Sequence, residues 1–411
     1  MNPQIAANQQ RLFLEFLAEL RPHLRRDSGL PRRLKEIFSR NRSLGSRDRK
    51  LYRELVFTAV RFLPWVESLL DSAPATAAKI IAWLAPELKP TTHYRAAHCS
   101  DWPAAPESLA EKAAILRAHH SGDFEPTALL PAWFREHCAA AFASPHLDSL
   151  NSRASVWIRI QCQDRSLVLD EFRGQRWDFQ QRADFPDAVQ LPPNAEVANT
   201  DAYRRGFVEI QDLGSQLVLA HAPVVPGTRW LDACAGAGGK TLQLARLVGD
   251  SGHVDATDIR LEILEELRDR ATRARLTNIA IVKTPAAPAA YDGVLVDAPC
   301  SGSGTWRRQP HLKWYLKPET IAEFTRLQLQ ILTTSAPRVR PGGLLVYATC
   351  SLSHHENQDV VAAFLAGHDQ FVAEAPARPL GGNYDGLGTT LLPGTLNTDG
   401  FYVSALRRRA G

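Results

Sequence analysis

Two cysteines that each follow an apolar run could supply a nucleophilic thiol. Cys300 stands in GVLVDAPCSGSGTWRR and Cys350 in GGLLVYATCSLSHHENQD, and each apolar run is typical of a buried strand. A free cysteine is usually a small buried filler, but serine, glycine, threonine and histidine surround these two. Ser353 and Glu356 have capping-box spacing, which predicts a helix that starts at Ser353. Because a helix N-terminus stabilises a thiolate, Cys350 is the stronger candidate nucleophile.

The segment TRWLDACAGAGGKTLQLARLV is typical of a strand, a glycine loop and a helix. Gly236, Gly238 and Gly239 would let the backbone approach a ligand at the free N–H groups of the helix start. A P-loop would need glycine where Cys234 stands, and a dinucleotide loop would need it where Thr241 stands. A third candidate is S-adenosylmethionine, whose carboxylate would bind the loop amides. The loop predicts nucleotide binding without choosing among the three.

Asp258 ends the next predicted strand, in HVDATDIR. An acid at this place accepts hydrogen bonds from ribose hydroxyls in Rossmann-like sites. The alternative is a structural role as the N-cap of the following helix, because aspartate is a favoured cap residue.

A thiol beside a methyl donor suits methylation of carbon 5 of a pyrimidine. That carbon is a poor nucleophile, and addition of a thiolate to carbon 6 makes it enamine-like. A carboxyl group near N3 would stabilise charge on the ring, and Asp297, three residues before Cys300, is placed for that role. The second thiol could assist loss of the carbon-5 proton and release of the product.

The elements that must position these residues form an alternating pattern after Gly206. Strands are predicted over 229–233, 253–257, 279–283, 293–297 and 344–348, with helices between them, which implies a mainly parallel α/β sheet. Ligands of such sheets bind at the carboxyl ends of the strands. Residues 1–125 are expected to be helical, and residues 126–205 to form a small α+β unit that starts with a short helix over WFREHCAAAF and includes a strand over VWIRIQ. The core is expected over 206–411.

Composition limits the class of protein. The 411 residues carry a net charge of only +4, but residues 21–53 hold twelve lysines and arginines against three acids, which favours a nucleic-acid partner. We expect a cytoplasmic protein, since no secretory signal and no membrane-spanning run is visible. The six cysteines show no CxxC spacing, so neither a metal site nor a disulfide scaffold is expected.

With these residues, the sequence resembles the Sun family of RNA cytosine-5 methyltransferases. LDACAGAGGKT is similar to the family's cofactor loop, DAPCSGSG with WRRQPHLKW to its fourth motif, and YATCSLSHHEN to its sixth. EIQDLGSQLV and LLPGTLNTDGFYVSALRR are similar to the segments at the two ends of its core. The resemblance therefore implies a Rossmann-like class I methyltransferase core that uses S-adenosylmethionine.

The resemblance also implies roles for individual residues. Cys350 would be the nucleophile and Cys300 would aid product release, while Asp297 would lie between cofactor and base and Lys240 near the catalytic centre. Asp258 would hold the ribose. The cofactor loop would be formed by Cys234, Ala235, Gly236, Ala237, Gly238, Gly239 and Lys240.

The chain departs from the family pattern at two places. Ala237 replaces the usual proline, which keeps the glycines in place. After the third core strand, IVKTPAAPAAYD contains no acid before Asp292, although the family usually contacts the adenine amino group with an acid there. A weaker grip on the adenine is expected.

Upstream, RNRSLGSRDRKLYRELVF resembles the NusB-like RNA-binding domain of the bacterial ribosomal RNA members, and PAWFREH with VWIRIQ resembles their small RRM-like subdomain. These resemblances favour 16S ribosomal RNA as substrate and a monomer without metal. Transfer RNA methylation and a catalytically silent RNA-binding ribosome-assembly factor are the alternatives. A nucleotide hydrolase is disfavoured by Cys234 in the first P-loop glycine position.

Overall fold

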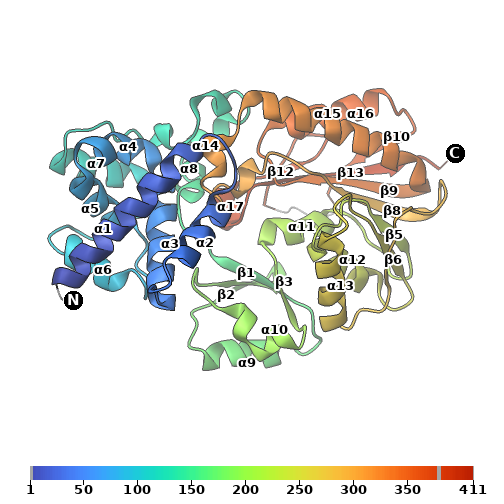
Figure 1. The fold of residues 1–411 in the computed structure, drawn as a ribbon. Coiled ribbons are helices and arrows are strands. Elements are labelled where there is room, and N and C mark those ends of the chain that lie inside the picture. The colour runs from blue at the N-terminus through green and yellow to red at the C-terminus, as the bar shows by residue number, and fades with distance from the viewer. Residues whose placement is uncertain (1–2, 377–380, 411) are drawn as a thin grey trace. The chain divides into compact units, whose positions relative to one another are not determined.

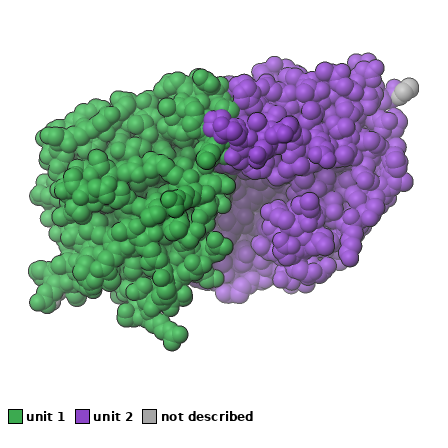
Figure 2. Space-filling model, turned by 45° about the horizontal axis from the view of Figure 1, so that its top comes forward, with its two compact units in different colours: residues 1–153, 305–317 green, residues 154–304, 318–411 purple. Residues whose placement is uncertain are grey.

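The computed structural model describes residues 3–376 and 381–410, and the chain folds into two compact units (Figure 2). One unit contains residues 1–153 and 305–317, and the other contains residues 154–304 and 318–411. Within the described ranges no helix has both the length and the apolarity needed to cross a bilayer.

The first unit is helical, as the apolar stripes of the first 125 residues predict. Its α-helices are α1 (Pro3–Leu20), α2 (Leu30–Arg40), α3 (Ser46–Arg61), α4 (Leu63–Ser72), α5 (Pro74–Leu84), α6 (Thr92–His98), α7 (Leu109–His119), α8 (His146–Leu150) and α14 (Leu312–Tyr315). On α1 the buried side chains Phe13, Phe16, Leu17 and Leu20 follow the i, i+3, i+4, i+7 pattern, so one face of the helix packs into the core. The prediction of a short helix over WFREHCAAAF is wrong. Two 3-10 turns, Ala132–Arg135 and Ala139–Phe142, are found there instead, and Cys138 between them has a non-helical backbone (φ −158°, ψ 85°).

A buried lysine fixes residues 305–317 within this helical unit. The Lys313 ammonium donates to the carbonyls of Arg61 at 3.1 Å and Leu129 at 2.9 Å, and to the side chain of Asn151 at 2.8 Å. Burial lowers the pKa of Lys313 well below its usual value. Three oxygen acceptors compensate for part of the desolvation of its charge. The segment WRRQPHLKW therefore packs with helices that precede it by more than 150 residues.

The second unit is built on a mixed sheet of the kind expected. Its order is β11-β12-β13-β9-β8-β5-β6-β7, and β10 also pairs with β13. The strands are β5 (Arg229–Asp232), β6 (His253–Ala256), β7 (Ile279–Ile281), β8 (Tyr291–Asp297), β9 (Val339–Thr349), β10 (Phe371–Glu374), β11 (Asn383–Tyr384), β12 (Thr389–Leu391) and β13 (Phe401–Arg408). The five strands from β5 to β9 are parallel and confirm the predicted strands, while the pairs made by β13 are antiparallel.

Helices cover both faces of this sheet (Figure 1). They are α11 (Leu213–His221), α12 (Gly239–Val248), α13 (Ile263–Arg273), α15 (Pro318–Ser335), α16 (Gln358–Ala366) and α17 (Pro393–Leu396). Alternation along β9 explains the two layers, because Leu344 and Val346 pack with residues of α11 and α12, whereas Leu345 and Tyr347 pack with residues of α15 and α16. A strand buried on both faces reads as a continuous apolar run.

A smaller antiparallel sheet lies in the same unit, in the order β2-β3-β1-β4. Its strands are β1 (Val156–Ile160), β2 (Gln180–Arg182), β3 (Phe185–Leu191) and β4 (Val208–Ile210), with helices α9 (Ser166–Gly174) and α10 (Asp201–Arg204). The strand expected over VWIRIQ is β1. Trp157 on β1 donates to the carbonyl of Asn397 at 2.9 Å, which ties this sheet to the region ahead of β13.

Candidate active site

The two candidate cysteines lie side by side at the ends of neighbouring parallel strands. β8 and β9 are paired up to Asp297 and Ala348, so the chain after each strand emerges at the same edge of the sheet. The sulfur atoms of Cys300 and Cys350 are 3.4 Å apart, and both side chains are half-buried. Adjacent strand ends thus bring together two thiols that are fifty positions apart in the sequence.

The buried carboxylate of Glu356 holds the two cysteine loops together. It accepts hydrogen bonds from the backbone N–H of Ser301 at 2.8 Å, the hydroxyl of Ser351 at 2.6 Å and the side chain of Gln328 at 3.1 Å. The helix start predicted at Ser353 is present as a single 3-10 turn, His354–Glu356, with Ser353 as its N-cap, and α16 begins at Gln358. The predicted capping box is wrong, because the Ser353 side chain makes no cap hydrogen bond and the Glu356 carboxylate accepts from the neighbouring Cys300 loop.

The environment of Cys300 keeps its thiol protonated. The hydrogen bond with Cys350 and burial of the side chain raise the pKa of Cys300 well above its usual value. A protonated Cys300 can donate a hydrogen bond to the sulfur of Cys350. Either sulfur can be the donor of this hydrogen bond, and burial favours the thiol form of Cys300.

An ion pair joins the glycine loop to the end of β8. The Lys240 ammonium lies 2.7 Å from a carboxylate oxygen of Asp297 and 5.2 Å from the centre of the Phe401 ring. Lys240 is buried, whereas the Asp297 side chain keeps 31% of its exposure. Asp297 can therefore still meet a ligand while Lys240 holds it in place.

The glycine loop has the backbone form that its sequence predicts. Gly236 has φ +51° and Gly238 φ +90°, in the left-handed region that favours glycine. A Cβ at Gly238 would lie only 2.7 Å from the side chain of Leu267, so a larger residue is excluded there. α12 starts at Gly239, and its first N–H groups are at the carboxyl edge of the sheet.

The other loop residues are held through their backbones. Ala235 donates to the carbonyl of Thr257 at 3.0 Å, and the carbonyl of Ala237 accepts from Arg270 at 2.7 Å. The thiol of Cys234 packs against the apolar cluster on the α15 and α16 side, and burial raises its pKa. Cys234 is therefore an inert thiol with a structural place in the loop.

Asp258 lies against the glycine loop. Its carboxylate accepts from the N–H of Gly236 at 2.9 Å and from the backbone and guanidinium of Arg260. Burial alone would raise the pKa of Asp258, but these hydrogen bonds outweigh it and the pKa is lowered. The N-cap of α13 is Glu262, so the capping role considered for Asp258 is excluded.

Sequence reasoning missed Asp232, the last residue of β5. Its carboxylate is 1% exposed, accepts from the Thr241 hydroxyl at 2.7 Å and from the Cys234 N–H at 3.3 Å. Burial raises the pKa of Asp232 to about 7. The available signal was an acid that directly follows the apolar residues Trp230 and Leu231 and precedes the glycine loop. Its hydrogen bonds to Thr241 and Cys234 help to shape that loop.

The structure also locates Asp292, the first acid after the third core strand. It accepts from the backbone of Arg229 at 2.7 Å and pairs with Arg340 at 2.6 Å. Arg229 is the first residue of β5, so Asp292 lies at the amino edge of the sheet, opposite the glycine loop. It cannot take the place of the acid that is missing from the segment after β7.

The site thus gathers the predicted residues at one edge of the sheet through three direct contacts. Gly236 meets Asp258, Lys240 meets Asp297, and Cys300 meets Cys350. The strands that carry them are adjacent, in the order β9, β8, β5 and β6. Such an edge can hold a nucleotide beside two thiols.

Comparison with known proteins gives concordant findings. The family described as 16S rRNA methyltransferase RsmB/F matches residues 219–407. The ribosomal RNA small subunit methyltransferase B of Yersinia enterocolitica is 30% identical over 73% of this chain and 70% of its own length. The probable enzyme of the same name from Bacillus subtilis is 33% identical over 60% of this chain, and the match spans only 58% of that protein.

Solved structures share the fold. The protein PH0851 superposes over 99% of both chains with a TM-score of 0.73 and 19% identity. NSun6 from Pyrococcus horikoshii, solved with SFG, covers 67% of this chain and 96% of its own, with a TM-score of 0.60 and 17% identity. At such identities these likenesses concern the methyltransferase α/β fold alone.

Proposed function

The chain belongs to the RsmB/F family of 16S rRNA methyltransferases, and from this premise we propose that it methylates carbon 5 of a cytosine in small-subunit ribosomal RNA. The observation that carries the proposal is the 3.4 Å separation of the Cys300 and Cys350 sulfurs at the carboxyl edge of the sheet. The names of the two curated relatives specify ribosomal RNA of the small subunit, which favours that substrate over transfer RNA.

The residues at this edge fit S-adenosylmethionine, which supplies an electrophilic methyl group when bound. The glycine loop leaves room for a ligand ahead of α12, since the Cβ position of Gly236 is open apart from the Arg260 side chain at 3.8 Å. The N–H groups of the loop would hold the carboxylate of the cofactor, and Asp258 would hold the ribose hydroxyls. NSun6, which shares the fold, was solved with SFG, an analogue of this cofactor.

Cys350 is proposed as the nucleophile. Its thiolate forms a bond to carbon 6, and the electron pair of the C5–C6 double bond moves to carbon 5, which takes the methyl group. The Asp297 carboxyl group, held by Lys240, stabilises the charge that develops near N3. Loss of the carbon-5 proton to a base then returns the electron pair, and the S–C6 bond breaks. Cys300, whose pKa is raised by the hydrogen bond with Cys350 and by burial, would assist this release by donating a proton to the departing sulfur.

We infer that the chain has three functional parts with the boundaries given above. Residues 1–125 act as the NusB-like RNA-binding domain, residues 126–205 as the RRM-like subdomain, and residues 206–411 as the methyltransferase domain. The all-helical character of α1–α7 supports the first assignment, and the antiparallel strands β1, β2 and β3 with α9 and α10 support the second. β4, the fourth strand of that sheet, follows just after the second boundary. The enzyme is proposed to act as a monomer.

The basic surface of the helical unit supports an RNA substrate. Ion pairs with acids neutralise Arg21, Arg25, Arg33 and Arg40. Other basic side chains of residues 21–53 are exposed to solvent and available to phosphates, namely Arg26, Lys35, Arg42, Arg47 and Arg53.

Purified protein, methyl-labelled S-adenosylmethionine and small-subunit ribosomal RNA test the proposal. Label is expected in 5-methylcytosine after digestion of the RNA to nucleosides. The matched control is Cys162→Ala, which removes a half-buried thiol of the small sheet region and should retain activity, whereas Cys350→Ala should abolish it. Label found only in adenine or on the protein would contradict the proposal.

A further inference from the structure

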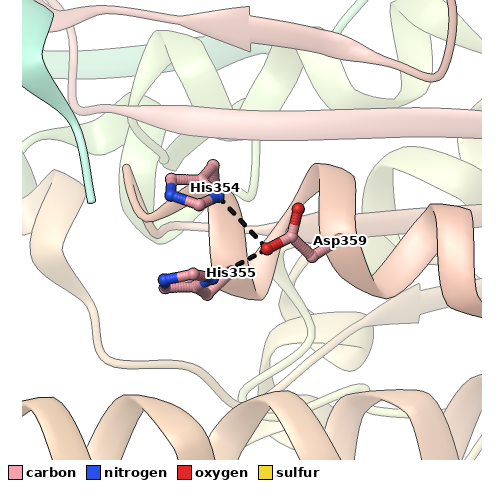
Figure 3. A group of neighbouring side chains, drawn as sticks. All are labelled: His354, His355 and Asp359. Carbon is pink, nitrogen blue, oxygen red and sulfur yellow. Dashed lines mark hydrogen bonds and ion pairs between the residues drawn. The ribbon is translucent and has the colours of Figure 1, made fainter. Parts of the chain in front are cut away.

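Three side chains close in sequence to the Cys350 loop, those of His354, His355 and Asp359, lie close together. The Nδ1 atom of His354 lies 3.2 Å, and that of His355 lies 2.7 Å, from the same carboxylate oxygen of Asp359 (Figure 3). The two imidazole rings are stacked obliquely, with centroids 4.0 Å apart. One potential ligand atom from each residue thus lies within 4.8 Å of the other two.

The three ligand atoms lie close enough to reach one zinc ion after small side-chain rotations. Ligand atoms about 2.0–2.1 Å from a tetrahedral ion are about 3.3 Å apart. The donors of His354 and His355 already stand near that distance from the Asp359 oxygen. The three side chains keep between 42% and 50% of their exposure, so an ion and its water can reach them from solvent.

Buried contacts fix the backbone that carries the two histidines. Thr325 on α15 donates to the carbonyl of His355 at 3.1 Å, and the Tyr347 hydroxyl donates to the carbonyl of Glu356 at 2.5 Å. The fully buried Glu356 side chain anchors the same turn, as described above. A ligand set on a rigid turn loses little conformational entropy when an ion binds.

We propose that His354, His355 and Asp359 form a surface site for a divalent transition metal of the zinc class, with water completing the coordination. Two imidazoles and one carboxylate suit zinc, whereas calcium and magnesium require mainly oxygen ligands. On binding, each Nδ1 atom becomes a ligand, so a proton on it is transferred to Nε2 or released to water, and both rings bind as neutral imidazoles. The prediction that the chain holds no metal was based on cysteine spacing alone and did not take account of the two histidines in SHHENQD.

The location links this site to the cysteine loops. Glu356, between the histidines and Asp359 in the sequence, holds Ser301 and Ser351, the residues that follow the two thiols. A bound ion would restrain the turn from its exposed side. The thiols of Cys300 and Cys350 are themselves a possible soft-metal ligand pair, so the test must separate the two sites.

Full-chain protein without a histidine tag is dialysed against zinc alone, and bound ions are counted. His355→Asn and Asp359→Asn should weaken zinc binding at least ~10-fold, since loss of even an outer partner of a metal ligand costs about that much. His93→Asn, an exposed histidine of the helical unit, is the matched control and should bind as the unaltered protein does. Circular dichroism of the metal-free variants establishes that each is folded.

A double variant, Cys300→Ser with Cys350→Ser, removes the competing thiols and should still take up one ion. Cobalt in place of zinc should give a visible spectrum without a sulfur-to-metal charge-transfer band. No zinc uptake, uptake that survives both His355→Asn and Asp359→Asn, or uptake lost only with the cysteines would each overturn the proposal. None of these outcomes depends on methyltransferase activity.

Discussion

The Lys240 ammonium and the Asp297 carboxylate lie 2.7 Å apart, and this ion pair connects the helix that follows the glycine loop to the end of the strand that leads to Cys300. Of the two partners, Lys240 is the more deeply buried. The pair therefore orients a partly exposed carboxylate at the place where cofactor and base are proposed to meet.

Neutralising this carboxylate should slow the chemical step. We expect Asp297→Asn to lower the single-turnover rate by about 10²–10³-fold, since groups that stabilise charge in the transition state contribute about that much. Lys240→Met should have a similar effect because Asp297 then loses its partner. The loss in the double variant should be less than the product of the two single losses, as for residues that act as one unit. If the loss of rate in the double variant equals the product of the two single losses, the two side chains act separately.

The two cysteines should give opposite phenotypes. Cys350→Ala should be inactive and form no adduct, because the attacking sulfur is gone. Cys300→Ala should accumulate a covalent protein–RNA adduct, because release loses its proton donor. Denaturing gels with labelled RNA measure both results. If Cys350→Ala trapped RNA and Cys300→Ala did not, the two roles would have to be exchanged.

The affinity for the cofactor should depend on Asp258 and on Arg260, which is hydrogen-bonded to it. Asp258→Asn should weaken S-adenosylmethionine binding by about 10-fold or more, since a charged acceptor contributes about 1.5–3 kcal/mol. Arg260 donates to both carboxylate oxygens, and its side chain is 59% exposed. Arg260→Gln should leave affinity unchanged or raise it by up to about 5-fold, the range of an exposed ion pair. Isothermal titration measures both, and a large loss with Arg260→Gln would mean that Arg260 itself contacts the cofactor.

The buried acid beneath the loop should make stability depend on pH. Burial, the first cause, and nearby Asp297 raise the pKa of Asp232 to about 7, while the hydrogen bond from Thr241 and the charge of Lys240 oppose the shift. The protonated form is therefore favoured in the folded state. Its stabilising contribution is complete below the ordinary aspartate pKa of 3.8 and is lost as pH rises toward 7.

Asp232→Asn should remove this pH dependence. The variant should match the unaltered protein near pH 4 and exceed its stability near pH 8 by up to about 4 kcal/mol, an upper bound from the shift in pKa. Denaturant unfolding followed at a series of pH values measures the difference. A difference that stays constant across this range would contradict the assigned protonation of Asp232.

The sequence predicted the placement of the chemistry better than the contacts that hold it. The apolar pattern of the sequence predicts β5, β6, β8 and β9. Because residues just beyond parallel strands lie at one edge of the sheet, the pattern also predicts that Cys300 and Cys350 are close together. Local capping rules failed at Ser353, because the Glu356 carboxylate is satisfied by a loop some fifty residues away. Likewise, nothing local indicates that Lys313 packs with Arg61. Long-range partners of buried polar groups leave no periodic signal.

The exposed basic side chains of the helical unit should set the salt dependence of RNA binding. Arg42, Arg47 and Arg53 are exposed, whereas the charge of Arg25 is already neutralised by Glu67 at 2.6 Å. Exchange of the first three for glutamine should weaken RNA binding, and should reduce the slope of log K against log salt by about 0.7–0.9 for each phosphate that an arginine no longer neutralises. Arg25→Gln is the matched control and should change the slope by less than any of the three. Filter binding at several salt concentrations measures the slopes, and identical slopes for the triple variant and the unaltered protein would place the RNA on another surface.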